Sequence, residues 1–325
     1  MNTHRKDVPQ RSEILFSGWR EAFGMGLERS RLTGGRYGSS NGSIFQTELD
    51  LKNGVVTKTL GGPKRSVELE AILKHEASVL NRLGGVVSPN CLFCGTRGLD
   101  YVLVTSLLPG CTLKEYASTQ AHTTEDVLRL GELLAEALET VHKAGFSHRD
   151  LKPEHVLVDD ERIFLCDFGM AGPATEAMAG RGCTPLYAAP EQLGLIKYPI
   201  GVEADLYSVG VILVELLTRG VPWANSKDLS FRLRSDLWVE NIPECVAGVI
   251  HRLLRPDPQR RYGSAKGLGA DLRELRSVGG LATLGRYDLR HKPNLSSFVG
   301  RDQELSRIAD WLDDSSAPIF SISAY

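Results

Sequence analysis

Apolar and polar residues alternate in the first strongly patterned stretch of the chain. The alternation runs over residues 44–49, stops at the polar turn Lys52-Asn53-Gly54, and resumes over residues 55–58. A period of two interrupted by an Asn-Gly turn is typical of two strands joined as a hairpin. Over residues 67–83 the apolar period lengthens to that of an amphipathic helix, and two more strands are expected to end at residues 102–104. The pattern therefore predicts a small sheet that carries one helix.

Beyond Gly110 the apolar spacing is mostly helical. The strongest helix is expected from Thr123 to His142, because Thr123 can cap the helix together with Asp126. Shorter helices are expected over residues 206–218, 245–254 and 264–275. The second part of the chain is thus predicted to be rich in helices.

The bulk composition is that of an ordinary globular protein. The chain has 325 residues, of which 42% are hydrophobic and 24% are charged, and its formal net charge is -2. Because basic residues are not in general excess, nucleic acids and anionic membranes are not expected as partners. No apolar run approaches the ~18 residues of a membrane-spanning helix, and residues 1–12 lack the apolar stretch of a signal peptide. A cytoplasmic location is expected.

The cysteines indicate a reducing compartment. All six are scattered along the chain rather than arranged as a disulfide framework. Cys91 and Cys94 have C-x-x-C spacing, but no second pair or nearby histidine cluster completes a zinc site. We expect both to be structural residues of a short strand.

Three short motifs follow one another between residues 148 and 191. The first is His-Arg-Asp-Leu-Lys-Pro-Glu-His at residues 148–155, the second is Asp-Phe-Gly at residues 167–169, and the third is Ala-Pro-Glu at residues 189–191. In this order they resemble the catalytic half of a protein kinase. One position departs from the family pattern, since His155 stands where the family has an asparagine that helps to hold magnesium.

The resemblance to serine/threonine protein kinases covers about residues 37–275 and implies an α+β fold with two lobes. Residues 31–108 would form a small β-rich lobe with one helix, and residues 109–278 would form a larger α-rich lobe. Residues 1–30 would be an N-terminal extension. The implied activity is transfer of the γ-phosphate of ATP to serine or threonine hydroxyls of a protein substrate.

The resemblance assigns catalytic roles to four residues. Asp150 would accept or orient the proton of the acceptor hydroxyl, and Lys152 would lie over the γ-phosphate. Lys58 would contact the α- and β-phosphates and pair with a glutamate of the following helix. We expect Glu76 to be this partner, because Leu80 follows it on the same helical face.

Two other glutamates of the same helix are alternative partners for Lys58. Glu68 and Glu70 are more typical of the solvent-facing side of the helix. Without the motifs of the second lobe, a lysine and a glutamate in such a segment would be ordinary surface charges.

The acceptor class is indicated by residues around the catalytic aspartate. Lys152-Pro153-Glu154 and Thr184 fit the serine/threonine pattern of the family. Arg149 resembles the arginine that pairs with a phosphate on the activation loop. Thr175 could carry such a phosphate and Glu176 could replace it, although Glu176 could also be a solvated loop charge.

The resemblance further implies that ATP is bound together with Mg²⁺, or with Mn²⁺ as an alternative ion. Asp167 would bind the metal that bridges the phosphates. Backbone groups of residues 106–108 would bind the edge of the adenine, and Thr105 would guard the space behind it. The residues expected to contact the nucleotide are Ser39, Gly42, Ile44, Lys58, Ser106, Leu108, Leu157 and Asp167.

The glycine-rich loop of the family is only partly reproduced. Gly42 fits its third glycine, whereas Tyr37 and Ser39 stand where the first two would be. Small residues still allow backbone amides to approach a phosphate. Taken alone, residues 34–42 would be typical of a flexible linker.

His155 determines how well the second metal position can work. Magnesium prefers oxygen ligands, so an imidazole should weaken this position while tolerating softer ions such as manganese. If the lost contact costs about 3 to 4 kcal/mol, the rate of transfer would fall by roughly 10² to 10³-fold. The alternative is a pseudokinase in which His155 is a hydrogen-bonded structural residue.

Two structural interactions are also expected from the resemblance. Glu191 and Arg261 match a buried ion pair that ties the substrate loop to the helical lobe. Asp205 matches an aspartate at a helix start that braces the backbone of His148 and Arg149.

The C-terminal part resembles the junction of a larger signalling protein. Residues 261–272 and 298–305 look like kinases that precede a STAND/AAA-type ATPase. Residues 279–297 would be a linker, and residues 298–325 the truncated start of that ATPase, with a strand near residues 319–324. Because no G-x-x-x-x-G-K-[ST] motif follows, this second module is expected to be incomplete and to act as an attached partner.

Overall fold

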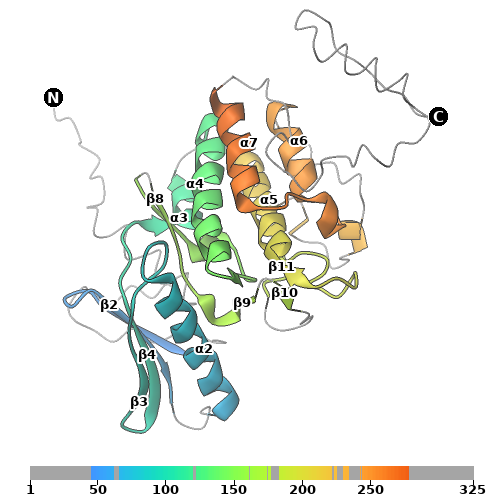
Figure 1. Cartoon of the computed structure of the whole chain (residues 1–325). Helices are drawn as coiled ribbons and strands as arrows, with labels where there is room; N and C mark the ends of the chain where they lie inside the picture. The colour runs from blue at the N-terminus through green and yellow to red at the C-terminus, as the bar shows by residue number, and fades with distance from the viewer. Residues whose placement is uncertain are drawn as a thin grey trace, which may run out of the picture. The chain divides into compact units, whose positions relative to one another are not determined.

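A computed structural model describes residues 45–277, with gaps at residues 62–65, 120–121, 161, 174, 177–182, 222, 225–229, 234–241 and 243. These residues form a small sheet with one helix and a larger helical lobe (Figure 1), so the predicted two-lobed α+β fold is confirmed. The predicted loop residues Ser39, Gly42 and Ile44 lie outside the described residues, as do the extension, the linker and the ATPase start at residues 298–325.

The small lobe is built on a four-stranded antiparallel sheet with the strand order β1-β2-β4-β3. The predicted hairpin pairs the first two strands, and Lys58 faces Leu103 on the central strand. One face of the sheet packs on a helix through Leu60, Tyr101 and Leu103. The strands are β1 (Gln46–Asp50), β2 (Val55–Leu60), β3 (Cys91–Arg97) and β4 (Asp100–Ser106).

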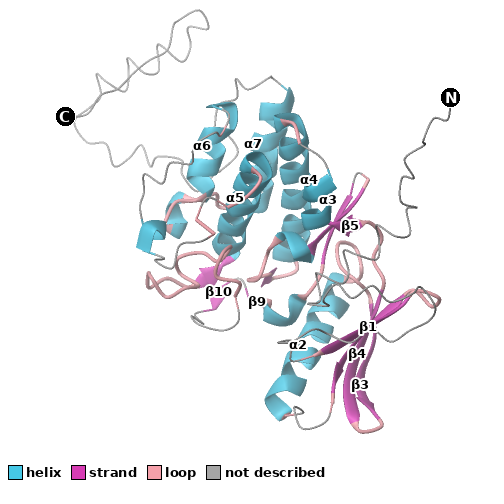
Figure 2. Cartoon of the chain, turned by 180° about the vertical axis from the view of Figure 1, so that it is seen from behind, coloured by secondary structure: helices cyan, strands magenta, loops and turns pink. Residues whose placement is uncertain are grey.

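Helix α2 (Val67–Leu83) occupies the range that the apolar spacing predicts. It begins after Ser66, whose side chain accepts a hydrogen bond from the Leu69 amide, and it ends at Gly84, which has φ 62°. This left-handed conformation favours glycine because a Cβ would be strained there. Its buried face carries one charged residue, Glu76, among apolar side chains. The sheet and this helix lie together in Figure 2.

The helical lobe surrounds α5, most of whose residues are buried. The predicted capping box of Thr123 and Asp126 is present at the start of α4. Helix α5 begins at Val202, four residues before the predicted start at residue 206. The prediction began late because Glu203 and Asp205 interrupt the apolar pattern. Acidic residues nevertheless suit the first turn of a helix. The helices are α3 (Leu113–Thr119), α4 (Thr124–Lys143), α5 (Val202–Thr218), α6 (Glu244–Leu253) and α7 (Ala265–Ser277).

Short strands and 3₁₀ turns position the motif residues between the helices. Their pairings are β5-β7-β8, β6-β9 and β10-β11. The strands are β5 (Cys111–Thr112), β6 (Phe146–Ser147), β7 (Val156–Asp159), β8 (Arg162–Leu165), β9 (Gly172–Pro173), β10 (Thr175–Glu176) and β11 (Ile200–Gly201). The turns are η2 (Pro153–His155), η3 (Phe168–Met170), η4 (Ser230–Leu233) and η5 (Pro258–Arg260). Among the described helices, none is long and apolar enough to cross a membrane.

The expected ion pair between Glu191 and Arg261 is present and fully buried. The guanidinium nitrogens of Arg261 lie 2.6 and 2.8 Å from the two carboxylate oxygens of Glu191. Both side chains are 0% exposed. Removing one partner would leave the other charge buried without compensation.

We expect Arg261→Met to lower the free energy of unfolding by about 3 to 5 kcal/mol. The matched control is Arg260→Met, because the Arg260 side chain is 72% exposed and lies 3.5 Å from Asp257. Urea unfolding followed by circular dichroism measures both variants. Equal stabilities of the two variants would contradict the importance of the buried pair.

Candidate active site

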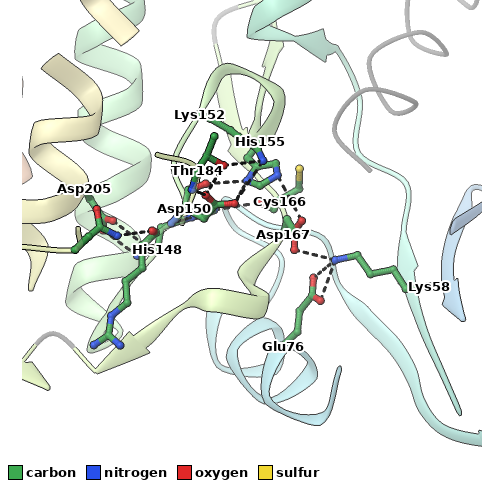
Figure 3. A network of polar contacts seen from close by, with 12 residues as sticks. Lys58, Glu76, His148, Asp150, Lys152, His155, Cys166, Asp167, Thr184 and Asp205 are labelled. Atoms are coloured by element: carbon green, nitrogen blue, oxygen red, sulfur yellow. Dashed lines mark hydrogen bonds and ion pairs between the residues drawn. The ribbon is translucent and has the colours of Figure 1, made fainter. Parts of the chain in front are cut away.

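The loop that carries Asp150 follows β6 and is held by buried side chains (Figure 3). The carboxylate of Asp205 accepts hydrogen bonds from the backbone amides of His148 and Arg149, both at 2.8 Å, so its predicted bracing role is confirmed. Arg149 has φ 66°, a left-handed conformation that is costly for a residue with a side chain. Gln192 holds the other side of this strained residue by donating to the Arg149 carbonyl at 2.6 Å. The backbone immediately before Asp150 is therefore fixed from two directions.

Asp150 is oriented toward Thr184. Its Oδ1 atom accepts hydrogen bonds from the amide and the hydroxyl of Thr184, each at 2.8 Å. Lys152 Nζ lies 3.1 Å from the same hydroxyl and 3.5 Å from Asp150 Oδ2. The structure thus brings together the predicted acceptor-side residues and the threonine that indicated the acceptor class. An ammonium beside this carboxylate can neutralise charge that develops during transfer.

Lys58 joins three segments of the chain, of which the one that carries Asp167 lies 109 residues away. Its ammonium on β2 donates to Glu76 on α2 at 2.7 and 2.9 Å, and to Asp167 Oδ1 at 3.0 Å (Figure 3). The predicted partner is therefore the one that the structure places beside Lys58. Of the alternatives, Glu68 is exposed and Glu70 lies 3.5 Å from Lys74 instead.

Electrostatics keep Lys58 and Asp167 charged at neutral pH. Burial alone would lower the pKa of Lys58, but the carboxylates of Asp167 and Glu76 outweigh it and raise this pKa above its ordinary value. Burial would likewise raise the pKa of Asp167, but the Lys58 ammonium holds it well below its usual range. The site therefore presents a cation and an anion side by side, as phosphate and metal binding require.

His155 is buried next to the carboxylates of Asp150 and Asp167 and is 1% exposed. Its Nδ1 atom lies 2.8 Å from the Asp150 carbonyl oxygen, which can only accept, so Nδ1 carries the proton when the ring is neutral. Burial lowers the pKa of His155 to about 4 despite the nearby charge of Asp167, so the ring is neutral at pH 7. The unprotonated Nε2 atom then faces Asp167 Oδ2 at 3.4 Å.

These two atoms fit a divalent metal ion. Two lone pairs that face each other at 3.4 Å repel, and a cation shared between them would turn this repulsion into attraction. Among the described residues, no group of three or more His, Cys, Asp and Glu is placed to hold a metal. The ion would therefore need further ligands, which nucleotide phosphates and water supply in sites of this kind.

The predicted nucleotide residues Leu108 and Leu157 belong to one buried apolar cluster. Two members on the small sheet, Leu49 and Val56, were not predicted to contact the nucleotide, because strand residues of this type carry no motif. In the predicted hinge, the Ser106 amide donates to Asn90 and the Leu107 amide donates to Gly54, so an adenine would have to bind other groups of this stretch. The cluster consists of Leu49, Val56, Leu108, Leu157, Phe164 and Cys166.

One link between the lobes was also missed. His75, next to Glu76 on α2, lies 2.6 Å from the carbonyl oxygen of Ala171, to which Nε2 must donate. Ala171 follows the Asp-Phe-Gly motif, so this bond ties α2 to the segment that carries Asp167. Because the partners are 96 residues apart, no local pattern indicates the contact.

Comparison with known proteins agrees with this arrangement. The family model described as the protein kinase domain matches residues 38–271. The chain belongs to the protein kinase family. Within this kinase chain, the match spans both the Lys58 cluster and the Asp150 loop.

Several curated relatives are serine/threonine kinases by name. The kinase chain is 28% identical to the probable serine/threonine-protein kinase CPE1738 of Clostridium perfringens, over 66% of this chain and 33% of the relative. It is 27% identical to serine/threonine-protein kinase PrkC of Bacillus subtilis, over 64% and 34%. It is 29% identical to human calcium/calmodulin-dependent protein kinase type 1B, over 62% of each. The chain thus spans about a third of the length of the two bacterial relatives.

Proposed function

We propose that this kinase domain transfers the γ-phosphate of ATP to serine or threonine hydroxyls of protein substrates. The observation that carries the proposal is the placement of two groups around His155. Lys58, Glu76 and Asp167 form the phosphate side, while Asp150 and Lys152 form the acceptor side. The names of the relatives and the residues after Asp150 favour serine and threonine over tyrosine as acceptors.

The proposed mechanism relies mainly on positioning and charge. Lys58 would bind α- and β-phosphate oxygens and is held for this task by Glu76. Asp150 would orient the acceptor hydroxyl and take its proton, while Lys152 would balance the negative charge that builds up on the γ-phosphate. Thr184 keeps the Asp150 carboxylate turned toward the acceptor side.

We propose Asp167 and His155 as the protein ligands of the divalent ion. Such an ion supplies positive charge that neutralises the phosphates. Asp167 contributes an oxygen of a carboxyl group whose pKa is lowered, and His155 contributes a neutral nitrogen instead of the family's amide oxygen. Because magnesium favours oxygen over nitrogen ligands, manganese should support activity better than magnesium in this chain.

Transfer of radiolabel from γ-labelled ATP tests the proposal. Wild-type protein should label a mixture of generic protein acceptors in the presence of Mg²⁺ or Mn²⁺, and acid hydrolysis should yield phosphoserine or phosphothreonine. Phosphotyrosine as the main product would contradict the acceptor class. ATP binding without transfer in either metal would favour the second candidate, a pseudokinase, for which the substitution at His155 is the specific reason.

We expect His155→Asn to raise the magnesium-dependent transfer rate by about 10²-fold, because it restores an oxygen ligand. The manganese-dependent rate should change much less. The ratio of the two rates is therefore sensitive to the metal ligand at residue 155 and not to a general change in folding. His122→Asn is a matched control, since its ring stacks on Tyr116 in another part of the helical lobe. A ratio that is equal in wild type and His155→Asn would contradict this assignment.

Two wider proposals concern the complete protein. We propose that the kinase domain acts in the cytoplasm as a signalling module. We also propose that it is attached to a C-terminal ATPase or sensor module, on the basis of residues 261–272 and 298–305. Mass spectrometry of the natural protein would test the attachment, and a natural protein that lacks sequence for such a module would contradict it.

A further inference from the structure

Residues Thr184 to Ala188, called the docking segment below, begin at the catalytic carboxylate. Thr184 binds Asp150 through its amide and its hydroxyl. The Thr184 carbonyl accepts from the amides of Tyr187 and Ala188 at 3.0 and 3.1 Å, and the Tyr187 carbonyl accepts from Ser208 at 3.0 Å. Two of the five carbonyls of the segment are thus paired within the segment or with α5.

The other three carbonyls are bound by one side chain. Arg232, in η4, donates to the carbonyl oxygens of Pro185 and Leu186 at 2.6 and 2.7 Å and also to that of Ala188. The contact spans more than forty residues of sequence, as the separation of 47 between Arg232 and Pro185 shows. Every carbonyl of the docking segment therefore has a donor, and Arg232 supplies the donors for most of them.

Arg232 is an unusual residue at such a position because it is charged and buried. It is 1% exposed, and its guanidinium lies 5.9 Å from the ring of Tyr207 on α5. A guanidinium has five donors in a fixed planar fork, so several carbonyls bound to it are held in one arrangement. Burying this charge costs free energy, which its hydrogen bonds to carbonyl oxygens partly offset.

We propose that Arg232 is a positioning residue for the acceptor substrate. By binding three carbonyls, Arg232 fixes the position of the docking segment in the helical lobe. Through Thr184 it also fixes the orientation of the Asp150 carboxylate. The inference rests on the proposed function, because it concerns how the acceptor hydroxyl is presented for phosphoryl transfer. The residues proposed to bind the nucleotide, Lys58, Glu76 and Asp167, bond to one another, whereas Arg232 bonds to the docking segment, so the two halves of the site should respond separately.

Steady-state kinetics with a serine- or threonine-containing peptide test the inference. In Arg232→Met the KM for the peptide should rise at least about tenfold, since three carbonyls of the docking segment lose a charged donor. The KM for ATP should stay within about twofold of wild type. Arg232→Lys keeps the charge but not the planar fork, so its KM for the peptide should lie between those of wild type and Arg232→Met. Added guanidinium chloride at low concentration should partly reverse the rise in the KM for the peptide in Arg232→Ala.

Arg273→Met is the matched control, because Arg273 is an arginine of the same lobe that pairs with Glu132 and Glu136. It should leave both KM values unchanged. Loss of thermal stability in Arg232→Met with an unchanged KM for the peptide would overturn the inference and leave Arg232 with a structural role only. Parallel rises in the KM for ATP and for the peptide would overturn it as well.

A second readout separates this inference from the proposed function. Hydrogen exchange of the amides of Thr184, Leu186, Tyr187 and Ala188 should be faster in Arg232→Met than in Arg273→Met, whereas exchange in α2 should not differ. If wild type transfers no phosphate, the proposed function fails and the acceptor role fails with it, while this exchange result still decides whether Arg232 holds the docking segment. Equal exchange rates in the two variants would show that Arg232 does not fix the docking segment.

Discussion

Replacing Asp150 with asparagine is expected to lower the rate of phosphoryl transfer by about 10³-fold, because an amide cannot take the proton of the acceptor hydroxyl. The substitution preserves size and an oxygen that can still accept from Thr184, so the loop should keep its conformation. Nucleotide affinity should change by less than about twofold, since the phosphate side of the site is made by other residues. Single-turnover transfer and nucleotide titration measure the two quantities.

Asp159→Asn serves as the control for this experiment. Asp159 ends β7 and lies 3.6 Å from Arg162, whose side chain is 70% exposed. Its replacement should leave transfer unchanged. An Asp150→Asn protein that transfers phosphate as fast as Asp159→Asn would show that Asp150 is not the proton acceptor.

Replacing Lys58 with methionine is expected to weaken both nucleotide binding and transfer. The ammonium pairs with Glu76 and Asp167, and the Lys58 side chain is only 10% exposed. Methionine would fill the space but leave two neighbouring carboxylates without a cation, and it would remove the expected ligand of the α- and β-phosphates. We expect the transfer rate to fall by about 10²-fold or more, because a buried charge-stabilising donor is lost. Transfer assays and fluorescence titration with a nucleotide analogue measure both effects.

Lys74→Met provides the matched control in the same lobe. The Lys74 side chain is 56% exposed and lies 3.5 Å from Glu70 on the surface of α2. A surface pair of this kind contributes little to stability. If Lys58→Met and Lys74→Met gave equal nucleotide affinities and equal transfer rates, the proposed phosphate-binding role of Lys58 would be wrong.

Local chemistry explains why much of the fold was predictable. Helix α2 has a serine cap at one end and Gly84 at the other, and α4 has its complete capping box. Signals of this kind act within a few residues, so they can be recognised in the sequence without the fold. The catalytic motifs are equally local, which is why Asp150, Lys152 and Asp167 could be named before any contact was known.

Contacts between distant segments explain what the sequence could not supply. Arg232 meets the docking segment across more than forty residues, and His75 meets Ala171 across 96 residues. Neither residue belongs to a motif, and an arginine in an irregular stretch usually faces solvent. The tautomer of His155 depends in the same way on the Asp150 carbonyl, which only the folded loop brings near. Such features depend on tertiary packing, which local patterns do not encode.

Single-turnover transfer of the γ-phosphate from ATP to a threonine-containing peptide, with Mg²⁺ and with Mn²⁺, tests the proposed kinase activity directly. Wild type should form phosphothreonine with both ions and faster with Mn²⁺. Asp167→Asn, which removes the charged metal ligand beside Lys58, should slow transfer by about 10²-fold or more with either ion. Absence of phosphothreonine from wild type with both ions, in protein that still binds ATP, would contradict the central claim that this domain catalyses phosphoryl transfer.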